Sequence, residues 1–361
     1  MLRFATFAQF ATPFNAIFGA GSIAGQTLPD ARLEALTQFA RRRSGFDDAP
    51  VTPASTDASF RRYFRVGQRT SFVVMDAPPG REDSGRFITI AGYLLEMGLN
   101  APRVIDADLE KGFLLLTDLG ETQYLSHLET HPQDAERLYG DAIRTLVTMQ
   151  LNGRRFKGQL PPYDEALLRF ELSLFRDWLC ERHLALELDA ADERHWQACC
   201  DVLVSNALEQ PKVFVHRDYH SRNLMLVDEN NPGILDFQDA VEGPWSYDIV
   251  SLLRDCYIEW PAERVEAWAR DYFDALPESM RGDVPFDRFL QQFDLTGAQR
   301  HLKAAGIFAR LKHRDGRDGY LADIPRTLSY VVNVATRYES LEWVGDFLQT
   351  RVLPALGTDK P

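Results

Sequence analysis

The chain has few cysteines, no long apolar run and no excess of basic residues, and each of these absences argues against a class of protein. Its 361 residues include four cysteines, and their positions do not follow the spacing of a metal site: Cys180, Cys199, Cys200 and Cys256. We therefore expect reduced thiols in a cytoplasmic protein. No run of about 18 apolar residues is present, so a membrane-spanning helix is not expected. At a formal net charge of -13, a nucleic-acid partner is not expected, because phosphate binding of that kind needs a basic face.

What is present is the composition of a globular protein. Hydrophobic residues make up 45% and charged residues 26% of the chain, which predicts one large or two modest domains. Residues 1–29 stand apart, because a single basic residue, Arg3, is followed by apolar and small residues. A secretory signal has a stronger basic start and a longer apolar core. We interpret residues 1–29 as a poorly ordered N-terminal extension, with a targeting role as the alternative.

From residue 30 the pattern is that of a small mixed α/β unit, followed by a larger helical one. The first unit has predicted helices at 31–43 and 84–97 and predicted strands at 59–66, 71–75 and 112–117. The second unit has predicted helices at about 132–151, 165–183 and 193–209. We therefore expect a smaller lobe that ends in a hinge at residues 30–120, and a larger helical lobe at residues 121–361.

Two motifs in the second unit indicate chemistry. Residues 213–227 have the sequence VFVHRDYHSRNLMLV, and residues 234–238 have the sequence ILDFQ. The apolar pieces on either side of a turn predict a hairpin that puts Asn223 beside Asp236. Two oxygen ligands placed in this way suit Mg²⁺. Asp218 is then placed to accept a proton from a substrate hydroxyl as that oxygen attacks the γ-phosphorus of a nucleotide.

The pattern HRDYHSRN, followed by LDFQD and by GPWSYD ending at Asp248, resembles the aminoglycoside phosphotransferase and choline kinase superfamily. That superfamily is similar to protein kinases in fold and in its ATP and Mg²⁺ chemistry. The resemblance implies an α+β, two-lobed protein-kinase-like fold, with a small mixed α/β N-lobe and a larger, mainly helical C-lobe. It also implies Asp218 as catalytic base, and Asn223 and Asp236 as Mg²⁺ ligands. His216 and Asp248 are expected to brace the catalytic loop, residues 216–223, rather than to touch substrate.

Four further segments resemble a narrower group within that superfamily. They are residues 57–65 (DASFRRYFR), 75–79 (MDAPP), 254–261 (RDCYIEWP) and 299–310 (QRHLKAAGIFAR). These segments are similar to the anomeric kinases of cell-wall amino sugars, which phosphorylate the 1-hydroxyl of N-acetylmuramate and N-acetylglucosamine during peptidoglycan recycling. The likeness runs from about residue 30 to the C-terminal region, and it implies a small-molecule sugar and ATP as the partners.

The nucleotide side departs from the protein-kinase pattern. The predicted strand at 71–75 offers no lysine where protein kinases carry one for the nucleotide phosphates. Arg61 and Arg65 share one face of the preceding strand, so one of them can supply that cation, and solvated strand arginines are the alternative. Ser55, at the place of a nucleotide-covering loop, and Asp118, where the hinge begins, complete the expected nucleotide-binding residues.

Substrate-binding residues are expected in the helical lobe. Tyr257 and Trp260 can stack on a sugar ring. Arg300 and Lys303, near Arg310 on one face of a helix-like segment, form a basic stripe that can bind the carboxylate of N-acetylmuramate, with a solvated helix face as the alternative. A polycationic aminoglycoside needs a dense acidic pocket instead. These residues favour a neutral or acidic sugar.

Three functions stay open at this point. The leading interpretation is an ATP- and Mg²⁺-dependent sugar 1-kinase. An aminoglycoside or other small-alcohol phosphotransferase uses the same machinery, and a nucleotide-binding pseudokinase is suggested by the missing lysine. Gln238 also replaces the glycine of Asp-Phe-Gly, which restricts the loop. The sequence is compatible with a monomer.

Overall fold

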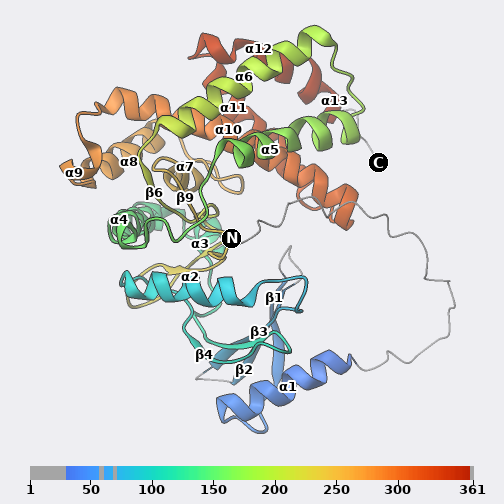
Figure 1. Cartoon of the computed structure of the whole chain (residues 1–361), viewed down its shortest axis with the longest axis vertical. Coiled ribbons are helices and arrows are strands. Elements are labelled where there is room, and N and C mark those ends of the chain that lie inside the picture. Colours follow the sequence, from blue (N-terminus) through green and yellow to red (C-terminus); the bar gives the residue numbers. More distant parts are fainter. Residues whose placement is uncertain (1–29, 57–60, 68–70, 358–361) are drawn as a thin grey trace, which may run out of the picture.

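The computed structural model describes residues 30–56, 61–67 and 71–357. The predicted extension at residues 1–29 lies outside the described residues, as do residues 57–59 of the predicted nucleotide-covering loop. The described residues form a smaller lobe built on a sheet and a larger helical lobe, with helix α2 (Ser84–Glu96) between the sheet and the helical lobe (Figure 1). Among these residues, no helix has both the length and the apolar character needed to cross a membrane.

A five-stranded antiparallel sheet forms the centre of the smaller lobe. Its strand order is β1-β2-β3-β5-β4, and the strands are β1 (Val51–Thr56), β2 (Arg62–Gly67), β3 (Ser71–Asp76), β4 (Val104–Asp108) and β5 (Phe113–Thr117). The sequence pattern predicts β2, β3 and β5 but not β1 or β4. These two are the edge strands, each with an irregular register, and β1 contains Pro53, which an edge strand tolerates because an outward N–H needs no partner.

Helix α1 (Ala31–Ser44) covers the outer face of this sheet, as Figure 1 shows, and agrees with the helix predicted at 31–43. Asp30 caps its first turn by accepting hydrogen bonds from the backbone N–H groups of Arg32 and Leu33. The buried residues of this interface form one apolar cluster: Leu36, Ala40, Phe64, Val66, Val74, Phe113 and Leu115. Burial of each large side chain there contributes about 1.5–3 kcal/mol.

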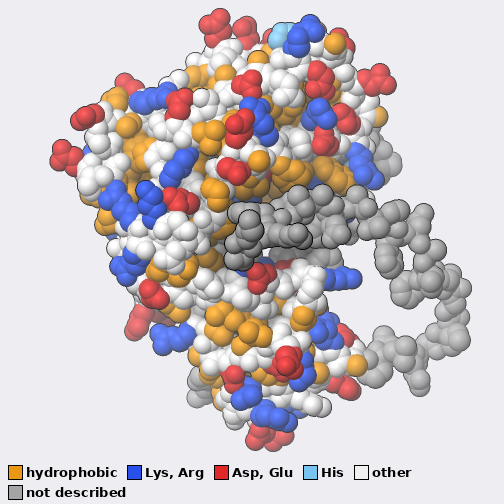
Figure 2. Space-filling model, in the orientation of Figure 1, with side chains coloured by type: hydrophobic (Ala, Val, Ile, Leu, Met, Phe, Trp, Pro, Cys, Tyr) orange, Lys and Arg blue, Asp and Glu red, His pale blue; other side chains and the backbone are white. Residues whose placement is uncertain are grey.

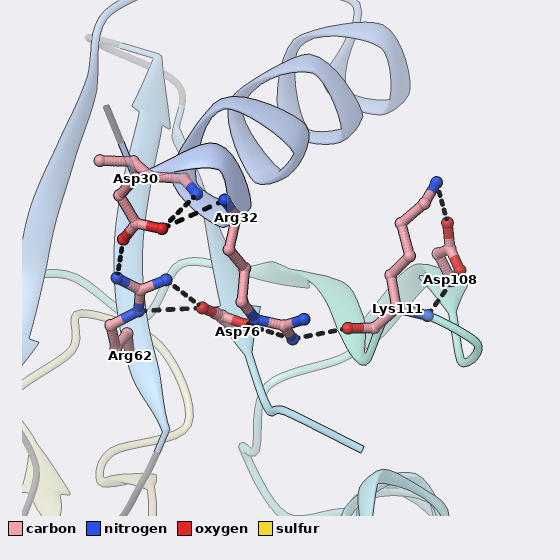
Figure 3. A network of polar contacts seen from close by, with 7 residues as sticks. Asp30, Arg32, Arg62, Asp76, Asp108 and Lys111 are labelled. Atoms are coloured by element: carbon pink, nitrogen blue, oxygen red, sulfur yellow. Dashed lines mark hydrogen bonds and ion pairs between the residues drawn. The ribbon is translucent and has the colours of Figure 1, made fainter. Parts of the chain in front are cut away.

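Ion pairs complete the contact between α1 and the sheet (Figure 3). Asp76 is fully buried and accepts hydrogen bonds from Arg32 Nε (2.7 Å) and Arg62 Nε (2.9 Å). Arg62 also pairs with Asp30 at 2.5 Å. Arg62 is therefore a structural residue of the outer face. Successive side chains of a strand point to opposite faces, so Arg61 and Arg65 lie on the inner face.

The larger lobe contains the helices predicted from the sequence, and further helices toward the C-terminus. The helices are α3 (Tyr124–Thr130), α4 (Ala135–Gly153), α5 (Glu165–Leu174), which continues as a π-helix at Phe175–His183, α6 (Ala190–Glu209), α7 (Tyr247–Leu253), α8 (Ala262–Ala275), α9 (Glu278–Arg281), α10 (Phe286–Asp315), α11 (Ile324–Ala335), α12 (Glu342–Phe347) and α13 (Leu353–Leu356). Two short antiparallel pairs, β6 (Lys212–Val215) with β9 (Val241–Pro244) and β7 (Leu224–Met225) with β8 (Gly233–Ile234), carry the catalytic motifs. The lobe division predicted after residue 120 falls between β5 and α3.

The thirty-residue helix α10 runs against α5, α6, α7 and α11. Its approach to α5 depends on Gly306, because a Cβ atom there would lie 2.3 Å from the carbonyl carbon of Leu174. No side chain fits at that distance, so glycine lets the two helices touch. The close approach brings Lys303 of α10 next to Glu171, a buried carboxylate of α5. On the surface, acidic and basic side chains are interspersed over the face shown in Figure 2.

Candidate active site

The catalytic loop follows β6 and is held by a buried aspartate. Asp248, in the first turn of α7, accepts hydrogen bonds from the backbone N–H groups of His216 (2.6 Å) and Arg217 (2.9 Å). Burial raises the pKa of Asp248 to about 7, although the two N–H groups act in the opposite direction. Arg217 has a left-handed backbone with a φ of 79°, which costs energy for a residue other than glycine and needs such support. These are the contacts expected of a loop brace.

Asp218 lies at the centre of this loop. Its carbonyl oxygen accepts hydrogen bonds from Asn223 Nδ2 (3.0 Å) and from the backbone N–H of His220 (3.1 Å). Its own N–H donates to His216 Nδ1 (3.2 Å), which can accept because burial lowers the pKa of His216 to about 4 and keeps the ring neutral. Burial alone raises the pKa of the Asp218 carboxyl, but the positive charge of Lys303 and of neighbouring side chains lowers it below its usual value. The carboxylate is therefore ionised at neutral pH.

The predicted hairpin is present as β7 and β8, and it brings Asn223 and Asp236 together. Asn223 Nδ2 lies 3.4 Å from Asp236 Oδ2, and the backbone N–H of Leu235 donates to the carbonyl oxygen of Asn223 (2.9 Å). Because Nδ2 of Asn223 donates to Asp218, its Oδ1 atom is left as an acceptor. One amide oxygen and one carboxylate fit Mg²⁺, whose other ligands are commonly phosphate oxygens and water. Within the described ranges, no group of three or more histidine, cysteine, aspartate or glutamate side chains is arranged to hold a metal alone.

Two groups that the sequence pattern does not predict hold Asp236 in place. Asp236 has a φ of 61°, and Gln238 Nε2 donates to its Oδ1 atom (2.7 Å). The glutamine that replaces the glycine of Asp-Phe-Gly thus orients the carboxylate. Arg86 of α2 donates from Nε to the carbonyl oxygen of Gln238 (2.5 Å) and from a terminal nitrogen to that of Ala240 (2.9 Å). Arg86 ties the smaller lobe to the loop that carries Asp236.

Glu171, a buried carboxylate on α5, forms ion pairs with cations beside the catalytic loop. Its side chain is 2% exposed, pairs with Lys303 Nζ (3.0 Å) and Arg217, and accepts a hydrogen bond from the hydroxyl of Tyr163. Lys303 also donates to the hydroxyl of Tyr247 (3.0 Å). Burial raises the pKa of Glu171, but Lys303 and Arg217 outweigh it, so the pKa lies below its usual value. Glu171 is a central site residue that the sequence reasoning missed.

On the other side of the catalytic loop lie Asp255 and Arg300. Asp255 is fully buried and accepts a hydrogen bond from the backbone N–H of Ser221 (3.0 Å). Arg300, one turn before Lys303 on α10, is 6% exposed, and a terminal nitrogen contacts Cys256 Sγ at 3.8 Å. Among the described residues, no carboxylate oxygen lies within 4.0 Å of its guanidinium nitrogens. The two residues predicted from the sequence, Arg300 and Lys303, therefore both lie beside the catalytic loop. Lys303 pairs with a carboxylate, whereas Arg300 contacts a sulfur atom.

The two predicted stacking residues are placed differently. The Tyr257 ring lies under the guanidinium of Arg222 in the catalytic loop, 4.1 Å from its centre, and 5.4 Å from the ring of His220. Trp260 instead donates its indole N–H to the hydroxyl of Tyr139 (2.7 Å) within an aromatic cluster of α4 and α8. Tyr257 thus contacts the catalytic loop, whereas the indole N–H of Trp260 already has a hydrogen-bond partner.

Of the arginines proposed for the nucleotide phosphates, Arg61 forms an ion pair with Glu82, just before α2, at 2.7 Å. Both side chains are nearly buried, at 8% and 11% exposure. In protein kinases, a strand lysine pairs with a glutamate of the small-lobe helix. Arg61 has a comparable partner, because Glu82 lies next to α2.

Arg65 and Asp118 bind one another. Arg65 Nε lies 2.5 Å from Asp118 Oδ2, and Arg65 also donates to the carbonyl oxygen of Gly120 (2.9 Å). Asp118 further accepts a hydrogen bond from Ser71 Oγ (2.7 Å). These contacts favour a role in fixing the hinge, which leaves Arg61 as the better candidate for the phosphates. Ser55 pairs with the strand β2, and its side chain lies outside the described part of the chain.

Comparison with known proteins identifies the family. The model of the phosphotransferase enzyme family matches residues 50–282. A Pseudomonas aeruginosa protein named N-acetylmuramate/N-acetylglucosamine kinase is 48% identical over 305 residues, covering 83% of this chain and 88% of the relative. The chain belongs to this phosphotransferase enzyme family. A relative of the same name from Pseudomonas putida is 42% identical over 334 residues, covering 88% of this chain and 96% of the relative. Another from Neisseria meningitidis is 43% identical over 299 residues, covering 81% of this chain and 88% of the relative.

Solved structures of phosphotransferases share the fold of this family member. A choline kinase from Streptococcus pneumoniae superposes with a TM-score of 0.59 at 12% identity, covering 84% of this chain and 99% of its own. An ADP-bound aminoglycoside phosphotransferase gives a TM-score of 0.54 at 15% identity, covering 84% and 98%. The predicted two-lobed, protein-kinase-like fold is confirmed.

Proposed function

We propose that this phosphotransferase transfers the γ-phosphoryl group of ATP to the anomeric hydroxyl of N-acetylmuramate or N-acetylglucosamine, as part of peptidoglycan recycling. The observation that carries the proposal is the convergence of Asp218, Asn223 and Asp236 in a chain whose relatives at 42% to 48% identity are named as kinases of these two sugars. We place the reaction in the cytoplasm because it consumes ATP, and the four cysteines are free and buried.

The acceptor is oriented by Asp218 in this proposal. Its ionised carboxylate accepts the hydrogen bond, and then the proton, of the attacking hydroxyl. His216 and Asp248 keep the loop in shape through the backbone contacts described above. Positioning and charge stabilisation are the main requirements for phosphoryl transfer, so a rigid loop is a direct contribution to rate.

The nucleotide side rests on Asn223, Asp236 and Arg61. Asn223 and Asp236 are the proposed Mg²⁺ ligands, and the ion, when bound, offsets the negative charge of the phosphates. Gln238 and Arg86 hold Asp236 in position. Arg61, paired with Glu82, is the proposed substitute for the missing strand lysine, because a guanidinium can make two hydrogen bonds to a phosphate.

The test is ADP formation with a panel of acceptors, namely N-acetylmuramate, N-acetylglucosamine, kanamycin and choline, together with the Asp218→Asn variant. Turnover with the two N-acetyl sugars that is absent from the variant supports the proposal. Turnover with kanamycin or choline alone assigns the chain to another branch of its family. Binding of ADP and Mg²⁺ without turnover on any acceptor supports a pseudokinase and contradicts the proposal.

A further inference from the structure

We propose that Arg300 binds the carboxylate of an acidic acceptor and thereby determines how strongly this enzyme prefers N-acetylmuramate to N-acetylglucosamine. The two sugars differ by the lactyl ether on the 3-position, which gives N-acetylmuramate a negative charge that N-acetylglucosamine lacks. The inference rests on the proposed function, because it concerns the acceptor side of the same site.

The first argument is that Arg300 differs in its partners from the buried cations around it. Lys303 pairs with Glu171 at 3.0 Å, and Arg217 pairs with the same carboxylate. Arg300 has a sulfur contact at 3.8 Å and no carboxylate within 4.0 Å in the described ranges, although it is 6% exposed. A buried guanidinium that has no carboxylate within ion-pair distance keeps N–H donors available for an anionic ligand, so such a residue is expected beside an acidic acceptor.

The second argument is the position of Arg300. On one side, Lys303 reaches Arg217, which precedes Asp218, through the shared partner Glu171. On the other side, Arg300 contacts Cys256, whose neighbour Asp255 holds the backbone of Ser221, three residues after Asp218. Arg300 therefore lies beside the loop that orients the acceptor hydroxyl.

The third argument is the geometry of the acceptor. The lactyl group sits two ring carbons from the anomeric carbon, so its carboxylate must be met by a cation close to Asp218. Arg222 in the same loop is stacked on Tyr257 at 4.1 Å, and the Lys303 ammonium already pairs with Glu171 and donates to Tyr247. Arg300 is the remaining candidate among these three residues. A planar guanidinium also matches a carboxylate with two parallel hydrogen bonds.

The experiment measures kcat/KM of the full chain for three acceptors: N-acetylmuramate, the neutral lactyl amide of N-acetylmuramate, and N-acetylglucosamine. Arg300→Met should lower the value for N-acetylmuramate on the order of 10- to 100-fold, the range for a hydrogen bond to a charged group, and should change the two neutral acceptors little. Arg300→Lys should recover part of the loss. Arg326→Met is the matched control, because Arg326 Nε donates to the carbonyl oxygen of Cys256 (3.0 Å) and pairs with Asp323 outside the loop.

An equal loss on all three acceptors would overturn the inference and assign Arg300 to the phosphoryl group or to Asp218 instead. Unchanged kinetics would overturn it as well. If Arg300→Met fails to fold, the wild-type comparison still decides, because equal use of the acid and its amide contradicts a carboxylate-binding arginine. Failure of the wild type on both natural sugars would instead contradict the proposed function.

Discussion

Replacing Glu171 by glutamine isolates the charge of the buried network, because the amide keeps the shape of the side chain. Glu171 is 2% exposed and pairs with both Arg217 and Lys303. Removal of one partner of a buried ion pair costs about 3–5 kcal/mol, because the other charge is left uncompensated. We expect about 3 kcal/mol, the lower end of that range, since glutamine can still accept a hydrogen bond. At about 2–4 °C per kcal/mol for a lobe of this size, the melting temperature should fall by about 6–12 °C.

Thermal unfolding followed by circular dichroism measures this difference. The matched control is Glu165→Gln on the same helix, because Glu165 pairs with Arg169 at 2.8 Å but is 58% exposed. An exposed pair contributes about 0–1 kcal/mol, so the control should melt close to the wild type. If Glu171→Gln melts together with Glu165→Gln, the network does not stabilise the catalytic loop and the reasoning is refuted.

The same variant gives a test in pH. Burial raises the pKa of Glu171, but Lys303 and Arg217 hold it below its ordinary value of 4.5 in the folded chain. A carboxylate whose pKa is depressed by folding adds stability above its unfolded pKa and loses that stability as the pH falls through its folded pKa. The difference in stability between wild type and Glu171→Gln should therefore be complete at pH 7 and shrink only below about pH 4.5.

Three further predictions concern the nucleotide and the catalytic loop. Arg61→Gln should raise the KM for ATP roughly tenfold or more, as expected for a lost hydrogen bond to a charged group. The control Arg62→Gln should lower the melting temperature and leave the KM for ATP unchanged. Equal KM values for the two variants would contradict the assignment of Arg61. Arg86→Met should weaken Mn²⁺ binding in the presence of ADP, measured by electron paramagnetic resonance, by about 10-fold or more, while Arg155→Met, which removes carbonyl contacts elsewhere, should not. Asp218→Asn should lower kcat by about 10²–10⁴-fold without changing the thermal shift that ADP produces, and wild-type turnover in this variant rules out a catalytic base at this position.

The parts of the site that the sequence predicts are those fixed by local chain geometry. Asn223 and Asp236 meet because a short hairpin joins them, and the turn residues and apolar runs of that hairpin are visible in the sequence. Likewise, strand alternation places Arg61 and Arg65 on one face. Local geometry does not predict partners, however, and Arg65 pairs with Asp118, 53 residues away in the sequence.

Contacts between distant segments could not be predicted in this way. Arg86 reaches the carbonyl oxygen of Gln238 across 152 positions, and Glu171 reaches Arg217 across 46. A signal for Glu171 does exist, because it lies on the apolar face of its helix between Leu168 and Leu172. A charged residue on a buried face needs a partner, and only the fold identifies that partner.

The central claim is that the anomeric hydroxyl receives the phosphoryl group. Phosphorus NMR of the product formed from N-acetylglucosamine, ATP and Mg²⁺, with Asp218→Asn as the control, tests it most directly. We predict a phosphomonoester signal coupled to the anomeric proton of the sugar and absent from the control. A signal coupled to protons at another ring position, or inorganic phosphate as the product, would contradict the assignment.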